Sequence, residues 1–226
     1  MQKKIVLQYY VLSGLLVYCG LSLTSAVYVT FLLKNGLSLM QANLVNAVFF
    51  LTLFVCEIPT GAFADIFGRK TSFVVACFLL ASGKYIYGLS SNMLFFIIAE
   101  IILAVAFTFQ NGAFQAWFVD SMKHHGYEDS FTTIFGRQSL ICQICSILGA
   151  ITGSYLYVID STPPWLVGGI LLVVLMLVAY LIMNEEYFKK ARFSFKLGMQ
   201  SMRNVAVKSI QYGMNHKSVR FVLIIT

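Results

Sequence analysis

The sequence predicts an all-α integral membrane protein built around a bundle of six transmembrane helices. Hydrophobic residues make up 59% of the 226 residues and charged residues only 11%, whereas soluble domains are about half apolar and about a quarter charged. Three prolines and a high aromatic content also exclude collagen-like and low-complexity chains. Because a spanning helix needs about 20 apolar residues, this length holds roughly six or seven spans and no separate soluble domain.

Apolar runs separated by charged or turn-forming residues give the predicted spans in order. The first span ends at the Lys-Asn-Gly turn at 34–36, and a very short Ser-Ser-Asn turn at 90–92 joins the third span to the fourth. Residues 160–164 are expected to form a non-helical loop because they include Pro163 and Pro164. The predicted spans cover about residues 9–33, 41–63, 71–89, 93–119, 136–158 and 165–183.

Lysine and arginine residues in the loops predict the orientation. Lys34 is the one loop cation on the far side of the predicted bundle, and all the others fall on the side of the N-terminus. The apolar run after Lys3 and Lys4 continues well past Ala26, so we interpret it as an uncleaved first span rather than a secretory signal. We therefore expect a multi-pass protein of the cell membrane, bacterial in origin, with a cytoplasmic N-terminus.

The sequence changes character after the sixth span. Residues 1–186 are predicted to form the six-helix bundle, and residues 187–217 a basic amphipathic helix on the cytoplasmic leaflet. Residues 218–226 read as the start of a seventh span, too short to cross a bilayer. We therefore expect a second six-helix bundle as partner, supplied by the same gene or by a second copy of the chain.

A G-x-x-x-D-x-x-G-R-K pattern lies between the second and third spans, and its fixed positions are Gly61, Asp65, Gly68, Arg69 and Lys70. The glycines permit a tight turn, and an arginine offers a planar fork for a carboxylate. In a chain with six spans and an inside N-terminus, this pattern resembles the cytoplasmic signature loop of the major facilitator superfamily. The preceding Glu-Ile-Pro-Thr-Gly resembles the version found in efflux-like branches.

The resemblance implies the N-terminal half of a secondary transporter that works by alternating access. It also implies that Arg69 joins Asp65 and Asp120 in a charge cluster that latches the two halves. Arg137, at the same membrane edge, belongs to this prediction. The alternative is that these charges only fix topology and loop shape. Two departures count against drug–proton antiport: the fifth span has no proline, and the fourth has Glu100 where such antiporters often carry an arginine.

Charges inside predicted spans are costly, which makes each a functional candidate. Lys84 and Glu100 lie about six and eight residues from the turn between their spans, on the order of 10 Å below the outer surface. We predict that they pair, or at least share a polar pocket for protons or substrate. The alternatives are a snorkelling Lys84 and a purely structural Glu100. Glu57 either anchors the signature loop or titrates. The fourth span adds amides suited to a cavity wall: Gln110, Asn111 and Gln115.

Other functions have weaker support in the sequence. The five cysteines all lie in apolar runs, His124 and His125 are adjacent on a polar loop, and there is no glycine-rich phosphate loop. We therefore predict no enzyme activity, no metal and no cofactor, and the distribution of basic residues does not favour nucleic acid. The favoured function is proton-coupled efflux of small drug-like or lipophilic compounds. The alternatives are uptake by a transporter of the same superfamily and a non-transporting membrane protein that acts as an interaction partner.

Overall fold

In the computed structural model, which describes residues 1–188, every regular element is a helix. Six stretches are long and apolar enough to cross a membrane, which confirms the predicted fold class. The predicted linker at 187–217, apart from its first two residues, and the predicted seventh span at 218–226 lie outside the described residues. The elements in chain order are α1 (Gln2–Leu16), the π-helical η1 (Val17–Ser22), α2 (Leu23–Ser25), α3 (Tyr28–Lys34), α4 (Leu39–Phe67), α5 (Arg69–Leu89), α6 (Met93–Gln110), α7 (Ala113–His124), α8 (Thr132–Ile159) and α9 (Pro163–Ile182).

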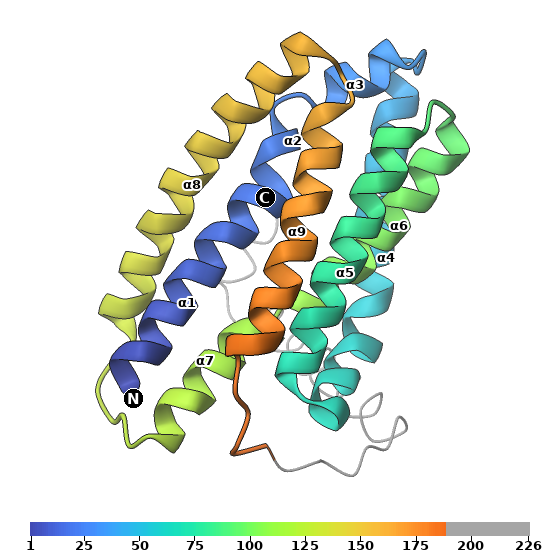
Figure 1. Ribbon diagram of the computed structural model, residues 1–226. Coiled ribbons are helices and arrows are strands. Elements are labelled where there is room, and N and C mark those ends of the chain that lie inside the picture. Colours follow the sequence, from blue (N-terminus) through green and yellow to red (C-terminus); the bar gives the residue numbers. More distant parts are fainter. Residues whose placement is uncertain (189–226) are drawn as a thin grey trace, which may run out of the picture. The chain divides into compact units, whose positions relative to one another are not determined.

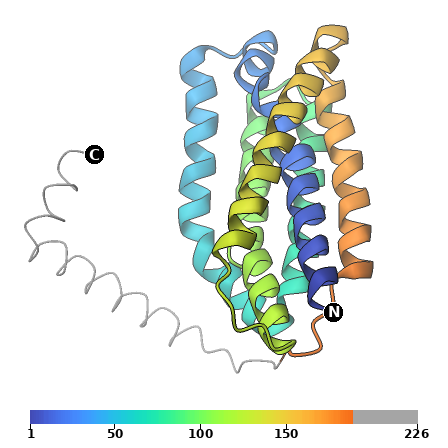
Figure 2. The ribbon, with the colours of Figure 1, turned by 90° about the vertical axis from the view of Figure 1, so that its left-hand side faces the viewer.

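Helix α5 is the most central element of the bundle. It packs against both α6 and α9, while α4 lies along α6 and α8 lies along α1 and η1 (Figures 1 and 2). Helices α4 and α8 are peripheral, and they leave large side chains such as Phe54 (77%) and Val158 (84%) exposed. Exposed apolar faces of this extent suit contact with lipid or with another apolar helix surface.

The first span is interrupted rather than continuous. Its α-helix widens into the π-helical η1, ends after α2 with a turn at 26–27, and resumes as α3. Helix α8 approaches this irregular stretch through two glycines. A Cβ on Gly153 would overlap the Leu23 carbonyl group, and a Cβ on Gly149 would lie 2.6 Å from Ser22 Cβ. Since only glycine permits this approach, α8 fixes the position of η1 and α2.

Several boundaries differ from the sequence prediction: α4 extends to Phe67 and α8 begins at Thr132, and three further differences have a local physical cause. The first span begins at Gln2 rather than near residue 9 because the helix continues into its polar end. The fourth span breaks into α6 and α7 at Gly112, whose φ of +75° is incompatible with a continuous right-handed helix. The loop after α8 is shorter than expected because α9 begins at Pro163. The fixed φ and missing N–H of proline suit the first helical turn.

Candidate functional site

A cavity of about 290 Å³ opens among the first span, α4, α5, α6 and α9. This volume is at the lower end of the range for small-molecule sites. Apolar walls are supplied by Leu21, Phe49, Leu103, Phe107 and Trp165. The polar and charged side chains that line it are Thr24, Ser25, Tyr28, Asn46, Lys84 and Glu100.

Glu100 is buried on α6, where its carboxylate meets two phenols. The hydroxyls of Tyr28 and Tyr87 both donate to its Oε1 atom, each at 2.6 Å. Tyr87 is in turn fixed by stacking on Trp165, with ring centroids 4.4 Å apart. Two donors to one carboxylate oxygen provide the hydrogen bonds that a buried acidic group requires.

Lys84 is buried on α5, with 2% of its surface exposed. Its Nζ atom donates to Thr24 Oγ1 at 2.5 Å and lies 5.4 Å from the centroid of the Trp165 ring. The ammonium group therefore points into the bundle and does not snorkel to the surface. Lys84 and Glu100 line the same cavity, but the one ion pair within 4 Å among residues 1–188 is formed elsewhere. The direct pairing that the sequence suggested is not observed.

That ion pair belongs to the signature loop. Arg69 Nη1 lies 2.6 Å from Asp120 Oδ2, and the two side chains are 26% and 37% exposed. Gly68 separates α4 from α5 with a φ of +96°, a conformation that favours glycine. The sharp turn places Arg69 in the first turn of α5, opposite the part of α7 that carries Asp120.

Glu185 is a further partner of the signature loop that the sequence reasoning missed. Its Oε1 accepts the backbone N–H of Arg69 at 2.6 Å, at the N-terminus of α5. A carboxylate is favourable there because the first N–H groups of a helix lack intrahelical acceptors. Burial raises the pKa of Glu185, while the N–H groups and charges of Arg69 and Lys70 counteract this rise. An acidic pair directly after the sixth span, at the membrane edge of the signature loop, was the available signal.

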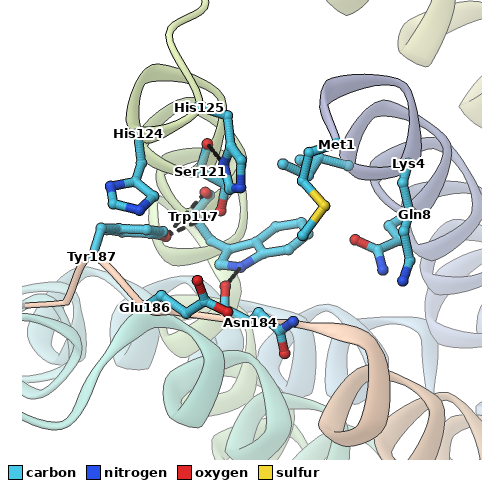
Figure 3. A pocket seen from close by; sticks show the side chains of 11 residues that line it. Met1, Lys4, Gln8, Trp117, Ser121, His124, His125, Asn184, Glu186 and Tyr187 are labelled. Carbon is cyan, nitrogen blue, oxygen red and sulfur yellow. Dashed lines mark hydrogen bonds between the residues drawn. The ribbon is translucent and has the colours of Figure 1, made fainter.

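Residues 184–187, which follow α9, form hydrogen bonds with α7 (Figure 3). Trp117 Nε1 donates to the Asn184 carbonyl at 3.0 Å, and the Tyr187 hydroxyl donates to the Trp117 carbonyl at 3.1 Å. Burial raises the pKa of Tyr187 to about 12, so its hydroxyl remains a donor at physiological pH. A small space of about 40 Å³ beside Trp117 is also lined by Lys4 and Gln8 from α1 (Figure 3). The segment therefore connects the end of α9 to α7.

The remaining predicted site residues are not brought into the cavity. Glu57, Asp65 and Arg137 are exposed, and none forms an ion pair among the described residues. Lys70 lies 4.8 Å from the centroid of the Tyr180 ring. The fourth-span amides lie at or near the break between α6 and α7, away from the cavity lining: Gln110, Asn111 and Gln115.

Known proteins resemble this chain in sequence. The family model described as Major Facilitator Superfamily matches residues 10–221. The chain belongs to the major facilitator superfamily. It is 24% identical over 147 residues to the uncharacterized MFS-type transporter YxaM of Bacillus subtilis strain 168. That alignment covers 65% of this chain and 36% of the relative, so the chain matches about a third of the relative's length.

Membership of this superfamily makes the chain a multi-pass membrane protein of a transporter family rather than of an enzyme family. Within residues 1–188 no three side chains of His, Cys, Asp or Glu are grouped in a way that could hold a metal ion. Glu100 and Lys84 are the buried charged residues among residues 1–188, and both line the cavity.

Proposed function

We propose that this chain is one half of a proton-coupled secondary transporter that exports small, largely lipophilic compounds by alternating access. The observation that carries the proposal is the buried carboxylate of Glu100 beside a cavity, in a chain of a transporter family. Ionisable groups at membrane depth are costly and mark proton or substrate pathways. The outward direction is proposed from the resemblance of residues 57–61 to efflux-like branches.

The cavity suits a site that is reached from one side of the membrane at a time. Its walls come from the first span, α4, α5, α6 and α9, and it is lined on one side by Asn46, which is itself exposed. We propose that a second six-helix bundle closes this side. In secondary transporters, sites of this kind lie between two repeats that rock against each other.

The signature loop has a separate role in this proposal. The ion pair between Arg69 and Asp120 is partly exposed, so it can break and form without burying an uncompensated charge. We propose that it latches the two bundles at the cytoplasmic face of a bacterial plasma membrane, where the N-terminus also lies. Asp65 and Arg137 are exposed, and we propose that they meet the second bundle at this edge.

The proposal is tested in proteoliposomes that contain the native gene product and a pH-sensitive dye. Addition of a transported compound is expected to dissipate a proton gradient across vesicles that contain the unchanged protein. Glu100→Gln removes the proton site and is expected to reduce the signal to that of empty vesicles. The matched control is Glu128→Gln, since Glu128 is exposed in the loop after α7. Equal activity of the two variants would refute proton coupling through Glu100.

The mass of the native polypeptide decides where the second bundle comes from. An antibody to residues 123–129 detects the product in cells. A band near twice the chain mass of 25.3 kDa would place both bundles in one polypeptide. A band at 25.3 kDa leaves a pair of chains or a non-transporting interaction protein. Crosslinking of two copies, together with transport, would then support the pair.

A further inference from the structure

The two charges of the cavity have unequal surroundings, and this difference bears on the ligand. Lys84 donates one hydrogen bond, to Thr24, although an ammonium group has three N–H donors. No carboxylate of the described residues lies within ion-pair distance of its nitrogen. A buried cation without a counter-ion is unfavourable unless an anion or another acceptor reaches it.

Glu100 does not lack partners in the same way. Two phenol hydroxyls already donate to one of its oxygens, Oε1, and these come from Tyr28 and Tyr87. The tyrosines thus satisfy one oxygen of the carboxylate with two donors, whereas the lysine nitrogen has a single neutral acceptor. A ligand that competed for Oε1 of Glu100 would have to replace two short hydrogen bonds.

A second unused donor lies close to Lys84. The indole N–H of Trp165 is buried and has no hydrogen-bond partner within residues 1–188. Trp165 also lines the cavity, and its ring is the one that the lysine nitrogen faces. Unsatisfied buried donors are rare in folded proteins, and each calls for an acceptor. Phe49, Leu103 and Phe107 also line the cavity and give it an apolar surface.

We propose that the cavity binds a small organic anion, a carboxylate on an apolar body. The carboxylate would accept hydrogen bonds from Lys84 and Trp165, and the apolar body would pack against Phe49, Leu103 and Phe107. The cavity volume of about 290 Å³ fits a compact molecule rather than a large drug. This inference rests on the proposed function and specifies its substrate class.

The test compares three probes that share one apolar body: cyclohexanecarboxylate, cyclohexylmethylammonium and cyclohexylmethanol. Their affinities for the purified full chain in detergent follow from the concentration dependence of the thermal unfolding midpoint. The carboxylate is expected to bind about tenfold or more tightly than the alcohol, the effect of one charge-assisted hydrogen bond. Lys84→Met is expected to abolish the preference, and Lys84→Arg to retain it. Lys34→Met is the matched control, since Lys34 also faces an aromatic ring, that of Tyr157, outside the cavity.

Each other outcome has a defined meaning. Tighter binding of the ammonium probe, lost in Glu100→Gln, would overturn the proposal in favour of a cation site. Equal binding of the three probes, or none, would also overturn it, and this comparison needs no variant to fold. The proton-release assay is independent of the result. Carboxylate selectivity without proton-coupled movement would refute the transport mechanism and leave the anion site standing.

Discussion

The chain holds two charged clusters whose charged side chains are stabilised by different kinds of partner. In the buried polar cluster (Thr24, Tyr28, Lys84, Tyr87 and Glu100) the cation and the carboxylate each bind neutral partners. In the signature-loop cluster (Arg69, Asp120 and Glu185) the charges of Arg69 and Asp120 meet directly at 2.6 Å, and Glu185 accepts the backbone N–H of Arg69.

The difference shows which charges are available to a ligand. A direct, partly exposed ion pair is satisfied by itself and needs nothing further from solution. The buried lysine has spare donors and faces a cavity, so an anion that enters would be its counter-ion. The signature-loop cluster is therefore suited to holding parts of the protein together, and the buried polar cluster is suited to binding.

The largest expected effect comes from a substitution that displaces the helices around the buried polar cluster. Gly153→Leu would force α8 away from Leu23, next to Thr24, and would misplace η1 and α2. Backbone overlap has no side-chain relaxation to relieve it, so we expect a loss of about 3 kcal/mol or more. The folded yield and thermal midpoint in detergent measure this loss. Gly136→Leu in the same helix is the control, since nothing lies within 4 Å of its Cβ. Similar losses in both variants would show that α8 tolerates no large residue anywhere.

The second prediction concerns a substitution that is expected not to lower the stability of the chain. Lys84→Met keeps the volume but removes a buried cation that has no counter-ion within ion-pair distance. We expect unchanged or increased stability, by up to about 1–4 kcal/mol, because hydrophobic replacement of buried charge is neutral or stabilising. Thermal unfolding without added anion measures this change. A loss of about 3–5 kcal/mol would indicate instead that Lys84 balances Glu100 across the cavity, and the two clusters would then differ less than their geometry shows.

Breaking the exposed ion pair between Arg69 and Asp120 tests the signature-loop cluster in the same way. Arg69→Gln is expected to lower stability by about 1 kcal/mol or less, because solvent screens a pair that is 26% and 37% exposed. The loss should disappear at about 1 M salt, and Asp120→Asn added to Arg69→Gln should cost little more. Lys123→Gln, an exposed residue of α7, is the control. A loss that salt leaves unchanged would mean that Arg69 acts through packing.

The sequence predicts the bundle well because spanning helices are encoded locally. Apolar runs of sufficient length, the turn at 90–92 and the signature loop each depend on neighbouring residues. The spacing of Lys84 and Glu100 from the turn at 90–92 is also local, and both side chains line one cavity. Their roles in coupling and binding stay predictions.

Contacts between residues that lie far apart along the chain could not be predicted from the sequence. The partners of Glu100 and Lys84 include Tyr28 and Thr24, which are 72 and 60 residues away along the chain. Tyr87 offered a usable signal, since it lies one helical turn after Lys84 on α5. Glu57 could not be excluded from the cavity by pattern alone, because the apolar residues of α4 are spread around the helix and its orientation is set by packing on α6.

The smallest expected effect concerns the pH dependence of Glu185. Because burial raises its pKa in the folded chain, folded molecules keep this proton at pH values where unfolded molecules have lost it. Its contribution to stability is therefore largest below the ordinary value of 4.5 and declines as pH rises through the raised pKa. Glu185→Gln should flatten the thermal midpoint in this window and leave it unchanged at lower pH. Glu128→Gln, exposed in the loop after α7, is the control. A midpoint that instead rises with pH, and loses that rise in Glu185→Gln, would show that the N–H groups of α5 and the charge of Arg69 outweigh burial. The signature-loop cluster would then stabilise the fold more than its exposure suggests.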